Sequence, residues 1–404
     1  MSYRFHASAP PGQWINDPNA LFFADGRYHL LVQHAADAPA FKRIGWGRLS
    51  SPDLMNWRWE GVVMPPEERA SIYSGSLAAG GGERRLFFTR HDPDGPWQTQ
   101  ASALLSPNLA GTIAGPGPIG PAGRNVRDPF VYRIAGGWRM LVARPCDWTG
   151  WRGDPPSSLE LWGSPDLVRW SKLATVGPWM EPGVMWEVPA LIDFGHIQAL
   201  ILSLVDRRAD TAECEVRYWL GRMTDQGFAR YEGFPPDGIP LDHGPDFYAA
   251  IPNVPDGWPM PDRVVIGWAS SWRTARLVPW PEARGGGPIT MPRRVRLAGE
   301  RLVLSPALNR DPDWMGRLEV GSRLSVTRGR AELRVEVSPD RLTIRRDLPD
   351  VSGFERGAPL PEKGGWEASL FADGPIVELF WRGTAITAAL PGEEPVRIAE
   401  ARAR

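Results

Sequence analysis

The 404-residue sequence predicts an all-β protein, a five-bladed β-propeller followed by a C-terminal β-sandwich. The 44 glycines and 42 prolines interrupt the chain too often for long helices, and they suit many short strands joined by turns. Hairpin patterns recur through the first ~300 residues, and longer alternating strands follow them. These observations favour repeated small sheets followed by two larger ones.

The propeller is predicted from hairpins at residues 20–33, 130–143 and 188–205, with turns at Asp25-Gly26 and Gly136-Gly137 in the first two. The stretches SPDLMNW (51–57) and SPDLVRW (164–170) share the pattern Ser-Pro-Asp-Leu-x-x-Trp. If the two copies are two blades apart, each blade has roughly 55–60 residues, and about five blades fill the first ~300 residues.

The sandwich is predicted from residues 318–347 and 376–390, in which apolar and polar residues alternate cleanly. That alternation is typical of antiparallel sheets that each have one solvated face. We therefore expect a propeller over residues 1–297, a linker over 298–316 and a sandwich over 317–404.

Composition disfavours several classes of partner. The 46 basic and 47 acidic residues nearly cancel, so neither a nucleic-acid binder nor a polybasic membrane binder is expected. Cys146 and Cys214 are far apart and suggest neither a disulfide framework nor a metal site. No secretion signal or membrane span is evident, so a cytoplasmic protein is expected. Assembly into homo-oligomers is left open.

Three acidic residues occur in similar local settings. Asp17 lies in WINDPNA, Asp128 in NVRDPF and Glu187 in MWEVPAL, and each comes immediately before or at the start of a predicted strand. Dipeptides such as Asp-Pro are common in turns, so each motif alone is a weak signal. In a propeller, however, the first strand of each blade lies near the centre, and the three acids are expected to converge at one end of the axis.

Converging carboxyl groups suit glycoside cleavage. Retention of configuration needs two carboxyl groups about 5–5.5 Å apart, one attacking the anomeric carbon and one acting as acid and then base. Glu187 has the more apolar sequence neighbours and is expected to be the acid. Asp17, beside Asn16, is expected to stay ionised, and Arg127 is expected to hold Asp128 ionised.

The motifs WINDPNA, VRDPF and WEVPAL resemble, in the same order, the motifs WMNDPNG, RDP and ECP of glycoside hydrolase family 32. That family contains invertases, levanases, inulinases and fructan exohydrolases. YHLLVQ, IGWG, YSGSL, DFYAA, VIGWAS, ITMPRRV and DGPIVELFWRG are similar to further family segments, so the resemblance covers essentially the whole chain. It implies a five-bladed propeller with a β-sandwich.

The resemblance also implies roles for individual residues. Asp17 would be the nucleophile that forms a fructosyl-enzyme intermediate, Glu187 the general acid/base and Asp128 the transition-state stabiliser. The sugar pocket would be lined by Trp14, Asn16, Gln33, Trp46, Tyr73, Ser74, Arg127, Asp246 and Trp268. Three positions depart from the family pattern, namely Ala20 for Gly, Val188 for Cys, and Arg48 for His.

The expected reaction is hydrolysis of terminal β-fructofuranosyl residues of sucrose and short fructooligosaccharides, with no metal or organic cofactor. Fructosyl transfer to a sugar, or hydrolysis of a phosphorylated sucrose met by Arg48 or Lys42, would use the same acids. Two further alternatives are an inverting arabinanase-like propeller enzyme, in which the carboxyl groups are farther apart, and a sugar-binding protein without catalysis.

Overall fold

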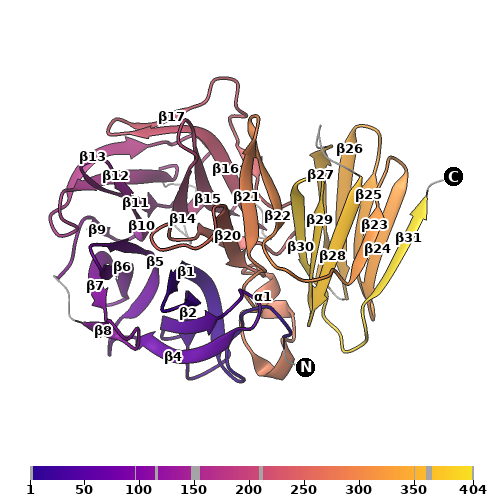
Figure 1. Ribbon diagram of the computed structural model, residues 1–404, viewed down its shortest axis with the longest axis horizontal. Coiled ribbons are helices and arrows are strands. Elements are labelled where there is room, and N and C mark those ends of the chain that lie inside the picture. Colours follow the sequence, from indigo (N-terminus) through magenta and orange to yellow (C-terminus); the bar gives the residue numbers. More distant parts are fainter. Residues whose placement is uncertain are drawn as a thin grey trace.

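The computed structural model describes residues 3–95, 97–113, 117–146, 155–208, 213–349, 351–360 and 366–402. Within them the fold is all-β, with five consecutive sheets followed by a two-sheet sandwich, which confirms the predicted fold class. Figure 1 shows the five sheets arranged around a centre, with the sandwich beside them.

Each of the five blades consists of four antiparallel strands in sequence order. Blade one contains β1 (Trp14–Ala24), β2 (Arg27–Ala35), β3 (Gly45–Ser51) and β4 (Arg58–Met64). Blade two contains β5 (Ser71–Gly80), β6 (Glu83–Asp92), β7 (Trp97–Leu105) and β8 (Thr112–Ile113), with β9 (Ala122–Gly123) paired to β7. Blade three contains β10 (Arg127–Ile134), β11 (Gly137–Arg144), β12 (Ser158–Ser164) and β13 (Ser171–Val176).

Blade four contains β14 (Val184–Asp193), β15 (Gln198–Asp206), β16 (Glu213–Thr224) and β17 (Gly227–Arg230), with β18 (Ile239–Pro240) paired to β16. Blade five contains β19 (Tyr248–Pro252), β20 (Arg263–Trp268), β21 (Arg293–Ala298) and β22 (Arg301–Pro306). A short helix α1 (Thr274–Leu277) and a 3-10 turn η2 (Pro281–Ala283) lie between β20 and β21.

The first strands of the blades contact one another in a ring, from β1 through β5, β10, β14 and β19 back to β1. Isolated bridges from Trp14 to Gly285 and from Leu21 to Asn253 join the first blade to the last. The N-terminal strand and the last blade thus close the propeller, and closure leaves no exposed edge between them.

The two Ser-Pro-Asp-Leu stretches form the same turn in blades one and three, between the third and fourth strands. In each, the aspartate side chain (Asp53 or Asp166) accepts hydrogen bonds from two backbone N–H groups further along the turn. Leu54 and Leu167 follow with φ of 66° and 64°. The repeat is therefore separated by two blades, as the sequence predicts. The turn of the second hairpin, in contrast, is Ala135-Gly136, one residue earlier than expected.

The sandwich packs one sheet of order β23-β28-β29-β30 against another of order β27-β26-β25-β24-β31. The strands are β23 (Trp314–Arg317), β24 (Ser322–Arg328), β25 (Ala331–Val337), β26 (Arg341–Leu348), β27 (Val351–Pro359), β28 (Glu367–Asp373), β29 (Ile376–Trp381), β30 (Thr384–Ala389) and β31 (Arg397–Arg402). A separate apolar core that includes Leu333, Val335 and Leu379 lies between the sheets.

The segment 298–316, expected to be a linker, is largely strand. β22 completes the fifth blade by pairing with β21, and β23 begins the sandwich by pairing with β28. The short run Arg301–Pro306 carries alternating apolar residues, and Leu302 and Leu304 are buried on its propeller face. The connection without strand is thus confined to the residues between these two strands.

A buried charge network joins the propeller to the sandwich. Arg293 on β21 donates hydrogen bonds to Asp242 at 2.7 Å and to Glu378 on β29 at 2.6 Å. His6 bonds Asp373 at 2.9 Å and Glu378 at 2.8 Å. Burial alone would lower the pKa of His6, but these hydrogen bonds outweigh it and raise the pKa to about 9. The imidazolium and guanidinium thereby compensate the buried carboxylates.

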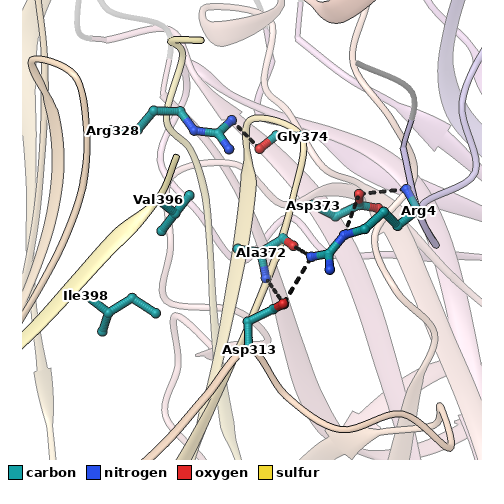
Figure 2. A pocket seen from close by; sticks show the side chains of 8 residues that line it. All are labelled: Arg4, Asp313, Arg328, Ala372, Asp373, Gly374, Val396 and Ile398. Atoms are coloured by element: carbon teal, nitrogen blue, oxygen red, sulfur yellow. Dashed lines mark hydrogen bonds and ion pairs between the residues drawn. The ribbon is translucent and has the colours of Figure 1, made fainter. Parts of the chain in front are cut away.

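The N-terminal segment is held against the sandwich by residues shown in Figure 2. Arg4 pairs with Asp313 at 3.1 Å and donates to the carbonyl of Ala372, while its backbone N–H bonds Asp373. A cavity of about 560 Å³ lies beside these groups, with Val396 on its wall. Arg4 is paired with Asp313 and Asp373, and Arg328 donates to the Gly374 carbonyl, which indicates a structural junction.

Among the described residues, no helix is long and apolar enough to cross a membrane. Within the same part of the chain, no three His, Cys, Asp or Glu side chains are grouped so that they could hold a metal ion.

Replacing Arg293 by Met should destabilise the protein strongly, because Asp242 and Glu378 would keep buried charges without their main cation. Removing one partner of a buried pair typically costs about 3–5 kcal/mol. Urea unfolding should show this loss. Arg296→Met on the same strand is the control, since that exposed side chain pairs with Asp262 at the surface. Equal losses in both variants would contradict the role given to Arg293.

Candidate active site

The first strand of every blade departs from regular pairing near one end. Register shifts occur between Ile15 and Pro18, Tyr73 and Gly75, Arg127 and Phe130, Glu187 and Ala190, and Tyr248 and Ile251. Asp128, Val188 and Ala249 have positive φ values of 64°, 44° and 51° at these points. Bulges of this kind re-aim side chains next to active sites, and here they occur around the whole ring.

Gly75 shows why one of these positions admits no side chain. A Cβ atom there would lie 1.9 Å from the carbonyl oxygen of Phe87 on the paired strand. The Gly75 N–H also bonds the Asn19 side chain of blade one at 3.0 Å. The close approach keeps Ser74, the residue before it, directed towards Asp17.

A cavity of about 370 Å³ lies where these irregular strand ends meet. It contains the three acids of the sequence motifs, Asp17 from β1, Asp128 from β10 and Glu187 from β14. The other lining residues are Gln33, Phe41, Tyr73, Ser74, His91, Trp97, Gln98, Arg124, Asn125, Arg127, Trp272 and Arg276. Three different blades thus contribute one carboxyl group each to a common space.

Asp17 is held by neutral hydrogen-bond donors. Ser74 donates to Oδ2 at 2.6 Å and Asn16 donates to Oδ1 at 2.9 Å, and Gln33 bonds both of these donors. Burial raises the pKa of Asp17 to about 6, with the Ser74 bond opposing the shift and the nearby Glu187 charge adding to it. The carboxylate is oriented by both oxygens and is ionised at neutral pH.

Glu187 is held by a cation and a phenol. Arg127 donates from Nε at 3.0 Å and from Nη2 at 2.8 Å to Oε1, and Tyr248 on β19 donates its hydroxyl to Oε2. Burial raises the pKa of Tyr248 well above its ordinary value, so the hydroxyl remains a donor. This setting differs from the apolar one expected from the neighbouring residues, because Trp186 points into the core instead.

Asp128 accepts a hydrogen bond from the backbone N–H of Val188 at 2.9 Å. Burial raises its pKa to about 7, while the charge of Arg127 lowers it and that of Glu187 raises it. Arg127 was expected to hold Asp128 ionised, and its charge does favour the ionised form, but its hydrogen bonds go to Glu187. Arg127 therefore neutralises the carboxyl group of the next blade and acts on Asp128 only through space.

Four residues expected in the pocket lie behind it. Trp14 donates from Nε1 to the side-chain oxygen of Asn16 at 2.9 Å, and Asn16 in turn bonds Asp17. Trp46 is fully buried with its indole N–H on the Tyr73 carbonyl, and Trp268 is fully buried with its own on the Gly286 carbonyl. These four side chains pack behind the residues that line the cavity and do not line it themselves.

Asp246 is not part of this cavity. It is fully buried and pairs with Arg346 of the sandwich, and it accepts the backbone N–H of Ala389 at 2.8 Å. The physical reason is its place just before β19, where the chain passes the sandwich before it reaches the axis. The residue of that segment that reaches the site is Tyr248, two positions later.

Several residues at the mouth were missed by sequence reasoning. Phe41, Trp97 and Trp272 form an aromatic rim, with Phe41 and Trp272 rings packed edge to face at 5.1 Å. Arg124 lies over the Trp97 ring at 4.9 Å, and Arg276 is exposed in α1. Phe41 lies between β2 and β3, Trp97 begins β7, and Trp272 lies between β20 and α1, and no sequence motif marks these positions.

The three departures from the family pattern have different surroundings. Val188 supplies through its backbone the N–H that bonds Asp128. Ala20 is buried within β1 beyond the acid. Arg48 donates to the ring of His29 at 3.1 Å and does not line the cavity. The side chains of Arg48 and Val188 are therefore removed from the space that holds the acids.

A family model, described as "Glycosyl hydrolases family 32 N-terminal domain", matches residues 6–306. A sucrose-6-phosphate hydrolase of Zymomonas mobilis subsp. mobilis is 26% identical over 397 residues, covering 91% of this chain and 74% of that protein. One from Escherichia coli is 30% identical over 330 residues, covering 75% and 64%. A levanase of Bacillus subtilis is 26% identical over 339 residues, covering 74% and 46%.

Solved structures share the fold. An exo-inulinase from Aspergillus awamori aligns with a TM-score of 0.80 at 21% identity, covering 99% of this chain and 95% of that one. A β-fructofuranosidase from Bombyx mori aligns with a TM-score of 0.77 at 21% identity, covering 100% and 94%, and a variant of it was solved in complex with sucrose. With three acids on three blades and the matched model over most of its length, this chain belongs to glycoside hydrolase family 32 and is a β-fructofuranosidase-like glycoside hydrolase.

Proposed function

We propose that this protein is a retaining β-fructofuranosidase that hydrolyses terminal, non-reducing β-D-fructofuranosyl residues of sucrose and short fructooligosaccharides. The observation that carries the proposal is the presence of Asp17, Asp128 and Glu187 in one cavity, to which three different blades contribute them. Retention uses two carboxyl groups that share one sugar in this way.

Asp17 serves as the nucleophile. Its carboxylate oxygen attacks the anomeric carbon of the fructosyl unit, and a covalent bond forms as the bond to the leaving oxygen breaks. Ser74 and Asn16 fix the two carboxylate oxygens, so the attacking atom is positioned without a cation beside it. Because these donors are uncharged, they lower the basicity of the carboxylate less than a direct ion pair would, and the carboxylate remains the better nucleophile.

Glu187 takes up a proton before the first step, gives it to the leaving oxygen, and then removes one from the water that cleaves the fructosyl-enzyme. Arg127 and Tyr248 bond its two oxygens from opposite neighbours and hold the carboxyl group in place. Asp128, ionised and held by the Val188 N–H, opposes the positive charge that develops on the furanose ring and accepts hydrogen bonds from its hydroxyl groups.

The shape of the site supports small substrates. A cavity of about 370 Å³ suits one fructosyl unit at the acids with a second sugar at the mouth. The aromatic rim of Phe41, Trp97 and Trp272 offers flat apolar surfaces against which the second sugar can pack. Transfer of the fructosyl unit to a sugar acceptor would use the same positions.

A phosphorylated sucrose is a second candidate substrate. Arg276 and Arg124 line the mouth, and a cation there could meet a phosphate on the leaving sugar. The relatives from Zymomonas mobilis and Escherichia coli are named sucrose-6-phosphate hydrolases, which supports the same idea. Arg48, weighed for this role from the sequence, lies outside the lining.

Release of fructose should be measured from sucrose, 1-kestose, inulin, levan and sucrose 6-phosphate. We expect sucrose or its phosphate and 1-kestose to be cleaved faster than the polymers, with retention in the first-formed product. Asp17→Ala should lower kcat by at least about 10³-fold, because no other group can form the intermediate. No fructose from any of the five sugars would contradict the proposal.

The pH dependence should report Asp17 and Asp128, which both have to be ionised. Their pKa values of about 6 and about 7 predict that kcat/KM falls as the pH is lowered from about 8 to below 6. Protonation of Asp128 removes the stabilising charge first, and protonation of Asp17 then removes the nucleophile. Ser74→Ala removes a hydrogen bond that lowers the pKa of Asp17, so the acid limb should move to higher pH. Ser76→Ala is the control, since that hydroxyl donates to the Pro129 carbonyl. An unmoved limb in Ser74→Ala would contradict the assignment.

Arg276→Met tests whether this arginine binds the phosphate of sucrose 6-phosphate. We expect it to raise KM for sucrose 6-phosphate about tenfold through loss of a charge-assisted contact, with KM for sucrose nearly unchanged. Lys42→Met and Arg48→Met serve as matched charge-removal controls. A larger effect from either control than from Arg276→Met would refute the role of Arg276.

A further inference from the structure

A second cavity, of about 730 Å³, lies at the opposite end of the central strands. On each first strand its lining residues follow the active-site residue in sequence, as Asn19 follows Asp17, Ser76 follows Ser74 and Phe130 follows Asp128. β14 and β19 contribute in the same way through Ile192 and Ile251. The space, which we call the rear cavity, is therefore enclosed by all five blades.

One wall of the rear cavity is aromatic and belongs to blade three. Phe130 and Tyr132 on β10 stack with ring centroids 6.1 Å apart and planes at 28°. Trp138 on β11 also lines the cavity, but it pairs with Arg133 and therefore lies on the other face of the same sheet. Near-parallel rings of this kind form a flat apolar platform.

The facing wall, from blade four, carries polar groups that are already fixed. Asp193 accepts the backbone N–H of Gly195 at 2.7 Å and a hydrogen bond from Gln198 at 3.3 Å. Gln198 also accepts the N–H of Met223 at 2.7 Å. Arg222 donates to the Gly195 carbonyl at 3.0 Å. Each group retains further hydrogen-bonding capacity, so the wall offers preorganised donors and acceptors.

The Tyr132 hydroxyl is buried and has no hydrogen-bond partner among the described residues. A hydroxyl group in this position can donate a hydrogen bond to a water or to a bound molecule. Because Tyr132 lines the rear cavity, a molecule bound there could supply that partner.

We propose that the rear cavity is a second, non-catalytic binding site for a neutral mono- or disaccharide. An aromatic platform facing fixed donors and acceptors matches a sugar, which has an apolar ring face and hydroxyl groups around its edge. The lining carries charges of both signs, with Asp193 and Asp256 beside Arg133, Arg222 and Arg263, so their effects on a charged ligand oppose each other. A purely apolar ligand would leave the Tyr132 hydroxyl unpaired.

Asn19 connects this site to the active site. Its side chain bonds the Asp17 carbonyl at 3.4 Å and the Gly75 N–H at 3.0 Å, and it also lines the rear cavity. The proposal rests on the proposed function only in its choice of probes, which are the sugars expected as substrate and products.

Met223 provides a reporter, because its side chain lines the rear cavity and not the active site. Asp17→Ala protein labelled with ¹³C at the methionine methyl groups should be titrated with sucrose, fructose and glucose, with Met223→Leu used to assign the signal. We expect a saturable shift of the Met223 methyl, while the exposed Met315 of the sandwich stays unchanged. Tyr132→Phe should weaken binding about tenfold, and Phe130→Ala, which removes the other ring of the platform, should abolish the saturable shift.

The outcomes separate this proposal from the proposed function, because fructose release by the parent protein is measured independently. No saturable Met223 shift with any of the three sugars would overturn the proposal. It would also be overturned if Tyr132→Phe and Phe130→Ala both bound the sugars as tightly as the parent protein. Glucose 6-phosphate binding more than tenfold tighter than glucose would replace a neutral ligand by an anionic one and also overturn it. Thermal unfolding of each variant checks that the fold is retained.

Discussion

The pairing of Arg127 with Glu187 is the interaction that allows three carboxyl groups to share one small cavity. Both side chains are largely buried, with exposed fractions of 11% and 13%. Without the guanidinium, three like charges would face one another away from water, and the folded state would hold them ionised only at a large cost. The cation comes from the residue directly before Asp128, so one strand supplies both an acid and a positive charge that lowers the cost of burying the acids.

The position of that pair depends on irregular backbone. A regular first strand would point alternate side chains into the two faces of its blade, where the neighbouring blades pack. The bulges at Asp17, Asp128 and Glu187 turn these side chains towards the axis instead. The positive φ at Val188 brings its N–H to Asp128. A strained backbone conformation in blade four therefore orients the acid of blade three. The ring of five blades keeps these conformations in place.

The sandwich contributes to the site indirectly. Asp242 and Asp246, on the segment that leads into β19, are held by Arg293, Arg346 and the backbone of β30. That segment ends at Tyr248, which bonds Glu187. The buried charges at the domain junction thus fix the entry of the fifth first strand, and through it one of the two contacts that orient the acid/base. A propeller without the sandwich would lack these contacts to the segment that leads into β19.

The sequence by itself determined the fold class, the hairpins, the repeat two blades apart and the three acids, because hydrophobic period, turn residues and short motifs are local properties. It also pointed to Gln33 and Ser74 through segments that resemble the family. Tertiary structure alone decided that Arg127 bonds Glu187, that Tyr248 and not Asp246 reaches the site, and that Trp46 and Trp268 are core residues. Each of these depends on contacts between blades or with the sandwich. A motif identifies a residue near the axis, but the bulge and the neighbouring blade set the direction of its side chain, and neither is encoded in a local pattern.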